Sequence, residues 1–224
     1  MGADVMQGSS REEVLRRIRA ALGAAPAEAK AIEFEWKALP RNYKRTGSLG
    51  REAMLELLED RLRDYDATVV RAQAGEVSVK ISQILAERGK QRLVVPAGLA
   101  EALGEALPAG AEFVEDAGFS PQELDGFDGV VTASTVAIAE TGTIVLQNVA
   151  GEGRRAPTLV PDYHLCVVKA ADVVETVPEA MARLQPTAAL ATTMISGPSA
   201  TADIEMTRIK GVHGPRFLDV ILVE

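Results

Sequence analysis

The sequence has a single cysteine, Cys166, among 224 residues. One thiol cannot form a disulfide within the chain, nor supply the roughly four thiolates that usually hold an iron–sulfur cluster. Two histidines also fall short of a structural zinc set, so we expect this chain to bind no metal or redox cofactor of its own. Cys166 lies in the apolar run Leu165–Val168, which favours a small buried core residue over a nucleophile.

Long apolar runs and targeting signals are also missing. No stretch of about 18 uncharged apolar residues is present, so we expect no membrane span. The first residues lack the basic and apolar segments of a secretory signal, and they lack the hydroxyl residue of a myristoylation site. These absences predict a cytoplasmic protein.

A basic stripe is absent as well. The net charge is −8, and basic residues alternate with acids, as in the segment Arg11–Glu13. Because binding to nucleic acid depends on neutralising phosphates with Lys and Arg, we expect no nucleic-acid partner.

The rest of the composition is that of an ordinary globular chain, with 47% hydrophobic and 25% charged residues. Residues 1–45 are predicted to form a helix, opened by a capping-box pattern at Ser10 and Glu13, and then an extended arm over residues 24–45. Phe34 and Trp36 of that arm could pin it to another surface. Residues 46–224 are predicted to form one α/β domain.

Short β-branched runs alternate with helical segments in this domain, which predicts right-handed crossovers and a mainly parallel sheet. Two apolar runs are separated only by Glu140–Gly142, which indicates a hairpin or a kinked strand. We therefore expect a three-layer α/β fold, with a mixed, mainly parallel sheet, helices on both faces and antiparallel strands where the loops gather. The expected strands are Thr68–Arg71, Arg92–Pro96, Glu112–Glu115, Gly129–Ala139, Thr143–Gln147, Thr158–Val160, His164–Lys169, Ala188–Ile195 and Phe217–Val223, and the expected helices of the domain include Val77–Arg88, Leu99–Leu107, Pro178–Leu184 and Ser199–Ile209.

Hydroxyl side chains gather at a strand end, in Thr132, Ser134 and Thr135. Hydroxyl and backbone donors at such a place can hold an anion. Capping of the strand end and formation of a turn would use the same residues. The sequence leaves both interpretations open.

Glu140, Thr141 and Gly142 join two strongly apolar runs. Placing a carboxylate in such surroundings costs free energy unless the carboxylate is hydrogen-bonded or has a functional role. If Glu140 points into a cleft, it could serve as a general base or nucleophile. On an exposed hairpin turn it would be a solvated turn residue.

The polar loop from Asn148 onward carries glycines and the pair Arg154 and Arg155. Guanidinium groups bind carboxylates and phosphates in a bidentate way, so this loop is a candidate anion site. It matches neither a P-loop nor the dinucleotide-binding fingerprint. A mobile surface loop is the alternative interpretation.

A second glycine-containing segment follows a buried strand near the carboxyl end. Gly197 precedes Ser199 and Thr201, either of which could cap a helix, and Asp203 lies near that helix start. The helix start could bind an anionic ligand, although its own acids would compete.

The two histidines have different surroundings. His213 lies in a glycine-rich turn and is a candidate acid or base. His164 enters an apolar strand and is predicted to be a hydrogen-bonded structural residue.

Four motifs follow one another along the chain: Ala139–Thr143, Pro161–His164, Ile195–Glu205 and Gly211–Pro215. In this order they resemble the lactate utilisation protein C family over roughly residues 45–224. The resemblance implies a fold shared with sugar-phosphate isomerases, coenzyme A transferases and formyltetrahydrofolate cyclo-ligase. It also implies a role in oxidising L-lactate to pyruvate beside a cysteine-rich protein and an iron–sulfur protein, which would carry the redox centres.

Two hypotheses follow from the motifs and the resemblance. In the first, the protein is a non-catalytic accessory or assembly subunit that binds a small carboxylate or phosphate between Glu140, the two arginines and the Ser199 helix start. In the second, it is a free-standing transferase or isomerase-like enzyme of acyl or sugar-phosphate chemistry that uses Glu140 and His213. The Glu-x-Gly pattern at Glu140 is similar to that of coenzyme A transferases. A third interpretation makes these loops a protein-docking surface.

Overall fold

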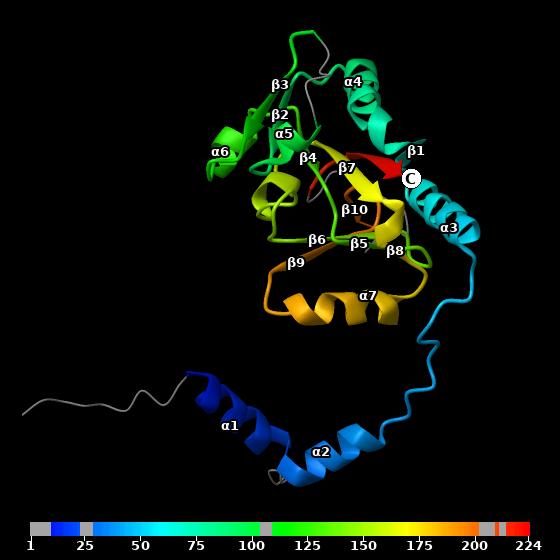
Figure 1. The fold of residues 1–224 in the computed structure, drawn as a ribbon. Coiled ribbons are helices and arrows are strands. Elements are labelled where there is room, and N and C mark those ends of the chain that lie inside the picture. Colours follow the sequence, from blue (N-terminus) through cyan, green and yellow to red (C-terminus); the bar gives the residue numbers. More distant parts are fainter. Residues whose placement is uncertain (1–9, 23–28, 104–108, 202–208, 211–213) are drawn as a thin grey trace, which may run out of the picture. The chain divides into compact units, whose positions relative to one another are not determined.

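The computed structural model describes residues 10–22, 29–103, 109–201, 209–210 and 214–224 (Figure 1). The chain divides into two compact units, Met1–Tyr43 and Lys44–Glu224. The first unit contains helices α1 (Ser10–Leu22) and α2 (Ala29–Ala38).

The extended arm predicted for residues 24–45 is wrong where α2 forms. Alanines and long unbranched side chains have high helix propensity, and Lys37 pairs with Glu33 one turn earlier at 2.7 Å. Phe34 and Trp36 are 75% and 64% exposed. Local propensity here outweighs the lack of a clear amphipathic period.

A six-stranded, all-parallel sheet forms the centre of the second unit. Its order is β1–β12–β7–β4–β2–β3, so the last strand of the chain lies between the first strand and β7. Most apolar residues of the inner strands are fully buried, as expected for a parallel sheet covered on both faces. The strands are β1 (Thr68–Ala72), β2 (Arg92–Val95), β3 (Glu112–Glu115), β4 (Gly129–Thr132), β7 (Tyr163–Lys169) and β12 (Phe217–Val223).

One face of this sheet is covered by α4 (Val77–Arg88) and α5 (Leu99–Leu103). Ile81 and Leu85 of α4 pack there against sheet residues such as Leu165. The helix ends at Gly89, whose φ of 63° is the left-handed conformation that glycine adopts without strain. The predicted α4 is confirmed, as is the α/β fold class with its parallel sheet.

A second, four-stranded sheet lies against the other face, next to α3 (Arg51–Asp64). Its order is β8–β5–β6–β9, and the pairs β5–β6 and β6–β9 are antiparallel. The predicted hairpin is therefore confirmed, but the antiparallel strands form a separate sheet instead of extending the parallel one. The strands are β5 (Val136–Ile138), β6 (Thr143–Gln147), β8 (Val173–Val174) and β9 (Thr192–Ile195).

Helix α7 (Val177–Leu184) covers the outer face of the small sheet, as Figure 1 shows. Its start is capped by Thr176 and Glu179 in a reciprocal capping box. Ala180 and Leu184 pack against the hairpin strands. The small sheet thus lies between the parallel sheet and α7.

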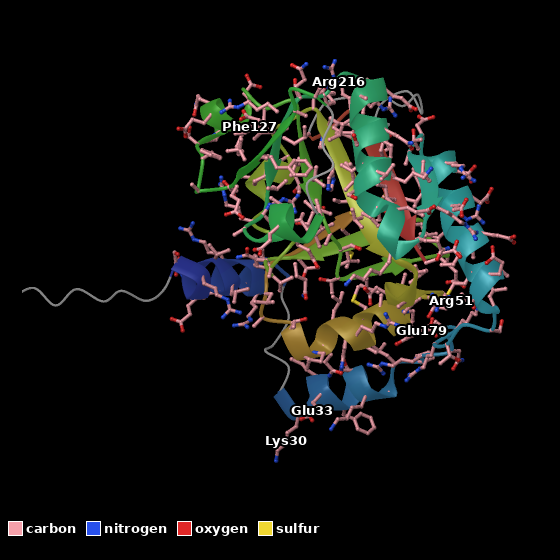
Figure 2. All side chains as sticks on the ribbon, turned by 45° about the horizontal axis from the view of Figure 1, so that its top comes forward. Lys30, Glu33, Arg51, Phe127, Glu179 and Arg216 are labelled. Atoms are coloured by element: carbon pink, nitrogen blue, oxygen red, sulfur yellow. The ribbon has the colours of Figure 1, made fainter. Side chains whose placement is uncertain are left out.

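Near β4, β2 and β3, the face of the parallel sheet opposite α4 and α5 is covered by α6 (Pro121–Leu124) and by aromatic residues. Phe127, labelled in Figure 2, has its ring centroid 5.3 Å from that of Phe119. The Arg92 guanidinium lies 4.4 Å from the Phe127 ring centroid, a cation–π contact.

Several predicted elements of this unit differ from the structure. The predicted strand Gly129–Ala139 is broken into β4 and β5, which belong to different sheets. The predicted strand Thr158–Val160 is wrong, because a 3-10 helix, η2 (Ala156–Thr158), turns the chain there. The predicted buried strand Ala188–Ile195 is only β9, an edge strand with exposed and half-buried residues alternating. The predicted helix at Ser199–Ile209 is wrong at its start, since β10 (Ala200–Thr201) pairs with β11 (Ile209–Lys210).

Among the described residues, no helix is both long and apolar enough to cross a bilayer.

Candidate functional site

A cavity of about 240 Å³ opens where the two sheets meet. The parallel sheet contributes residues near the amino ends of β7 and β12, and β9 with its following loop forms the opposite wall. Its polar or charged lining residues include Arg155, His164, Thr193, Ser196 and Ser199.

His164 is the titratable residue at the inner wall of this cavity, and its side chain is only 2% exposed. Its Nε2 lies 2.8 Å from the hydroxyl of Thr132 on the neighbouring strand. Burial lowers the pKa of His164 to about 4, so the ring is neutral near pH 7. The prediction that His164 is hydrogen-bonded inside the structure is confirmed, and the residue also contacts a cavity.

Cys166 lies one pleat further along β7, and its sulfur is 3.6 Å from the Thr132 hydroxyl. Burial raises the pKa of the thiol to about 12. A thiol that stays protonated and has no solvent access is a poor nucleophile, so the predicted structural role of Cys166 is confirmed.

The two consecutive arginines have different roles. Arg154 donates two hydrogen bonds to the Asp116 carboxylate, at 2.6 and 2.9 Å, and a third to the Phe119 carbonyl at 2.6 Å. The guanidinium lowers the pKa of Asp116. Arg154 therefore fixes the loop to the end of β3.

Arg155 is exposed, and its Nη1 lies 3.4 Å from the Thr193 hydroxyl. Within the described part of the chain, no carboxylate pairs with this guanidinium. Arg155 lines the first cavity and also an adjoining cavity of about 350 Å³. The two cavities also share Thr158 and Thr193.

The adjoining cavity contains a residue that sequence reasoning missed. Glu152 is 5% exposed, and its carboxylate accepts hydrogen bonds from the Thr135 hydroxyl (2.8 and 2.9 Å) and the Gln147 backbone N–H (2.6 Å). Burial raises the pKa of Glu152. The sequence feature that could have identified Glu152 is its position between two glycines, next to a buried strand.

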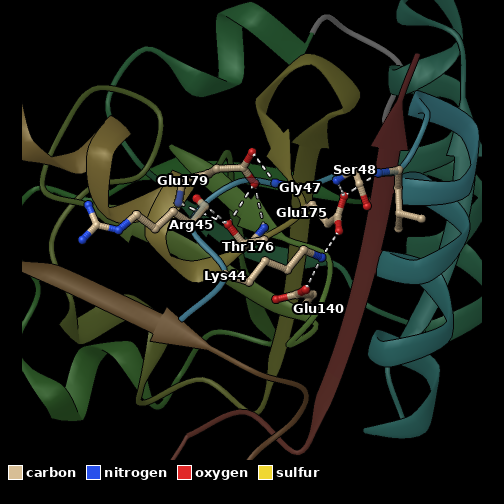
Figure 3. Close-up of polar contacts among 9 residues, drawn as sticks. Lys44, Arg45, Gly47, Ser48, Glu140, Glu175, Thr176 and Glu179 are labelled. Carbon is tan, nitrogen blue, oxygen red and sulfur yellow. Dashed lines mark hydrogen bonds and ion pairs between the residues drawn. The ribbon is translucent and has the colours of Figure 1, made fainter. Parts of the chain in front are cut away.

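Glu140 lies at the tip of the β5–β6 hairpin, and its side chain is 38% exposed. Figure 3 shows Lys44 between Glu140 and Glu175, bonding both carboxylates, with a distance of 2.9 Å to Glu140. Glu140 lines neither of the two cavities described above. Its proposed catalytic role stays a prediction.

The rest of the hairpin tip packs on α3. Gly142 has a φ of 58°, and a Cβ there would lie 2.8 Å from the Arg61 Cβ. Thr141 and Thr143 share a hydrogen bond of 2.7 Å, and Thr143 lies 2.8 Å from the Ser196 hydroxyl. The hydroxyls thus connect the hairpin tip to the wall of the first cavity.

Lys44–Leu49, which we call the strap, is held by carboxylates at the start of α7 (Figure 3). Glu175 is 4% exposed and accepts the backbone N–H groups of Ser48 (2.6 Å) and Leu49 (2.7 Å). Glu179 accepts the N–H of Gly47 at 3.0 Å. Hydrogen bonding with Lys44, followed by that from Leu49, lowers the pKa of Glu175.

Several other predicted site residues are placed apart from one another. Gly197 and Ser199 line the first cavity together with Arg155, whereas Asn148 and Arg154 line the adjoining one. The Ser134 hydroxyl is buried and has no hydrogen-bond partner in the described part of the chain.

The predicted residues nearest the carboxyl end are only partly accounted for. The side chain of Thr201 lies outside the described residues, as do Asp203 and His213 as a whole. Because the backbone at Thr201 is a strand, the helix start that it was predicted to cap is absent there.

We expect Glu140→Gln to leave binding of small carboxylates unchanged and to lower the melting temperature by no more than about 2 °C, because the Lys44 pair is solvent-exposed. Thermal denaturation with and without carboxylate would check both values. The enzyme hypothesis instead requires this variant to lose turnover of an acyl thioester or sugar phosphate while keeping its melting curve.

Comparisons with known proteins agree with this architecture. A family model described as the LUD domain matches residues 55–223. A lactate utilization protein C from Deinococcus radiodurans is 40% identical over 190 residues, covering 84% of this chain and 87% of the relative. One from Bacillus pumilus is 28% identical over 248 residues, covering 96% and 97%. A crystal structure of a DUF162 family protein from Deinococcus radiodurans matches with a TM-score of 0.67 and 35% identity, covering 79% of this chain and 100% of that one.

The parallel sheet, the small antiparallel sheet against it and the domain match define an α/β protein with a LUD domain. The chain belongs to the lactate utilization protein C family, which confirms the resemblance seen in its motifs.

Proposed function

We propose that this protein is an accessory subunit of an L-lactate-oxidising system and binds a small carboxylate at Arg155. One observation carries the proposal: a guanidinium without a carboxylate partner in the described part of the chain lies where two cavities adjoin. The neighbouring Arg154 is held by the Asp116 carboxylate and the Phe119 carbonyl, so the contrast between the two side chains supports a ligand role for Arg155.

The surroundings of Arg155 suit a monovalent organic acid. A guanidinium forms charge-assisted, bidentate hydrogen bonds with a carboxylate. Across the cavity, neutral His164 adds hydrogen-bonding capacity without adding charge, and Ser196 adds a hydroxyl. In the first cavity, one positive group with neutral polar neighbours favours a ligand with one negative charge.

The proposed link to lactate oxidation rests on the relatives, which carry the name lactate utilization protein C. The single cysteine of this chain supports placing the redox centres on partner proteins, as the family resemblance implies. In this proposal a cysteine-rich and an iron–sulfur subunit perform the oxidation, and this chain assists assembly or holds the small acid.

We expect propionate, lactate or pyruvate to raise the melting temperature of the wild-type protein. At 100 times the dissociation constant, a ligand adds about 2.7 kcal/mol of stability, which corresponds to about 5 to 10 °C for a chain of this length. Arg155→Ala should weaken binding at least about tenfold, because it removes the charge-assisted bonds.

Arg51→Ala is the matched control, since Arg51 is an exposed arginine at the first residue of α3. It should keep the full thermal shift. A shift that survives in Arg155→Ala, or the absence of any shift in the wild type, would contradict the carboxylate site. Unchanged growth on lactate after deletion of the protein would contradict the subunit role.

A further inference from the structure

The open edge of the small sheet carries no charge. Its outermost strand, β9, pairs only with β6 in the described part of the chain. No charged residue occurs from Leu184 to Ala202, although 25% of the residues of the whole chain are charged. Nine of the thirteen residues from Leu184 to Ser196 are nevertheless exposed. Depletion of charge is what distinguishes the centre of a protein–protein interface from the rest of a protein surface.

The other edge strands of the two main sheets differ from β9. β3 begins with Glu112 and ends with Glu115, and β1 contains Arg71. β8 has only two residues, and both are buried. Charges and short length protect an edge strand from pairing with another chain. The four residues of β9 are without a charge that would do so.

The backbone of β9 offers hydrogen-bonding groups at this edge. Asn148 donates its backbone N–H to the carbonyl of Ala191 at 3.3 Å, and bonded and non-bonded residue pairs alternate along an antiparallel ladder. Thr193 therefore bonds to β6. Thr192 and Met194 direct their N–H and C=O groups away from β6, toward the open edge.

An apolar groove of about 520 Å³ lies beside this edge, between β9 and α7 (Figure 1). Met181 of α7 and Met194 of β9 line it, and they are 44% and 50% exposed. All of its described lining residues are uncharged. Methionine side chains adapt to the surface that covers them and are enriched at interfaces. A molecule that covers the edge would bury them as well.

We propose that a second copy of this chain covers the edge, with its β9 antiparallel to the first about a two-fold axis at Thr193. Thr192 then lies opposite Met194 of the second copy, and each such pair exchanges two hydrogen bonds. The two four-stranded sheets become one eight-stranded sheet. The inference goes beyond the carboxylate site at Arg155 and does not depend on it.

Two properties of the edge favour a second copy over a different protein. The outward-facing residues Thr192 and Met194 pair with each other about the axis, so the edge is its own complement, as an isologous interface requires. Each chain also carries a net charge of −8, so two copies repel each other unless they meet through uncharged surfaces. A charged partner would instead be recognised by opposite charges.

The size of the surface sets the expected strength. It offers about half of the roughly 20 to 30 residues per side of a standard interface, so we expect a reversible dimer with a Kd on the order of 10 μM. Sedimentation velocity of the full chain at about 1 to 200 μM brackets this value. The weight-average mass should rise from that of one 23.8 kDa chain toward that of two.

Met194→Lys should raise the Kd at least about tenfold, because the dimer would bury an ammonium group without a partner. Val79→Lys is the matched control, since Val79 on α4 is 49% exposed and lies away from β9. It should keep the wild-type Kd. A wild type that stays monomeric over the whole range, or a dimer that Met194→Lys leaves unchanged, would contradict the proposal. The wild-type result needs no variant.

Thr193→Cys tests the pairing of the strands. In a non-hydrogen-bonded antiparallel pair the Cα atoms lie about 4.5 Å apart, which a disulfide can span. The native Cys166 is buried, so the introduced thiol is the accessible one. Mild oxidation should link most of the Thr193→Cys protein into dimers and leave Val79→Cys unlinked. If Met194→Lys disrupts the dimer but Thr193→Cys does not link it, the β9 pairing is wrong.

Discussion

Arg88→Ala should lower the melting temperature by about 8 °C. Asp219 on β12 is 1% exposed, and its carboxylate accepts two hydrogen bonds from Arg88, at 2.9 and 2.6 Å. Tyr163 adds a hydroxyl bond at 3.0 Å. Without Arg88 the buried carboxylate loses its cation. Removing one partner of a buried pair costs about 3 to 5 kcal/mol, and we take the lower value because Arg88 is 34% exposed.

Adding Asp219→Asn to Arg88→Ala should recover part of this loss, because the double variant no longer buries an uncompensated charge. Differential scanning calorimetry on the wild type and the single and double variants would measure the coupling. A loss below about 2 °C for Arg88→Ala would show that water or rearrangement compensates Asp219.

Acidification from pH 7 to pH 4 should destabilise the wild type by about 3 kcal/mol more than it destabilises His164→Gln. The pKa of His164 is about 4 in the folded protein, compared with 6.5 for an unperturbed histidine. Between these values the unfolded state binds the proton first, so stability falls as the pH falls. The contribution of His164 is fully present above about pH 6.5 and is lost progressively toward pH 4.

Urea denaturation of both proteins at a series of pH values would give this difference. Subtracting the two curves removes the titration of carboxylates, which the proteins share. Gln at position 164 retains a polar group near the Thr132 hydroxyl, so the variant should fold. A difference that does not change with pH would show that His164 is protonated as easily in the folded state as in the unfolded state.

The parts of the fold that were predicted from sequence have strong local signals. The apolar run of β12 has the same bounds in the prediction and in the structure, and so does the helical segment of α4. The hairpin followed from the short spacing at Glu140–Gly142. These signals depend on residues that are close together in the chain.

Strand partners were less accessible to prediction. The residues of β5 and β6 are as apolar as those of the parallel strands, so their period does not reveal that they form a second sheet. That arrangement depends on pairing with β8 and β9, which lie 30 or more residues further along the chain. The second sheet is therefore determined by long-range strand pairing and not by local propensity.

The candidate site shows the same limit at the level of single residues. Arg154 and Arg155 are identical and adjacent, and only the fold places Asp116 within reach of Arg154. Glu152 was missed because its burial depends on hydrogen bonds from Thr135 and Gln147. The sequence thus identified the loop that contains Glu152, Arg154 and Arg155, but only the structure distinguishes the roles of these three residues.

The strap has a consequence for how this chain tolerates change. Carboxylates of Glu175 and Glu179 hold it through main-chain N–H groups, so the side chains of Ser48 and Leu49 can be replaced without loss of those bonds. Gly47 is different, since a Cβ there would lie 2.4 Å from a Glu175 oxygen. Substitutions should therefore be tolerated at Ser48 and Leu49 but not at Gly47. Glu175 and Glu179 must remain acidic to keep accepting these N–H groups.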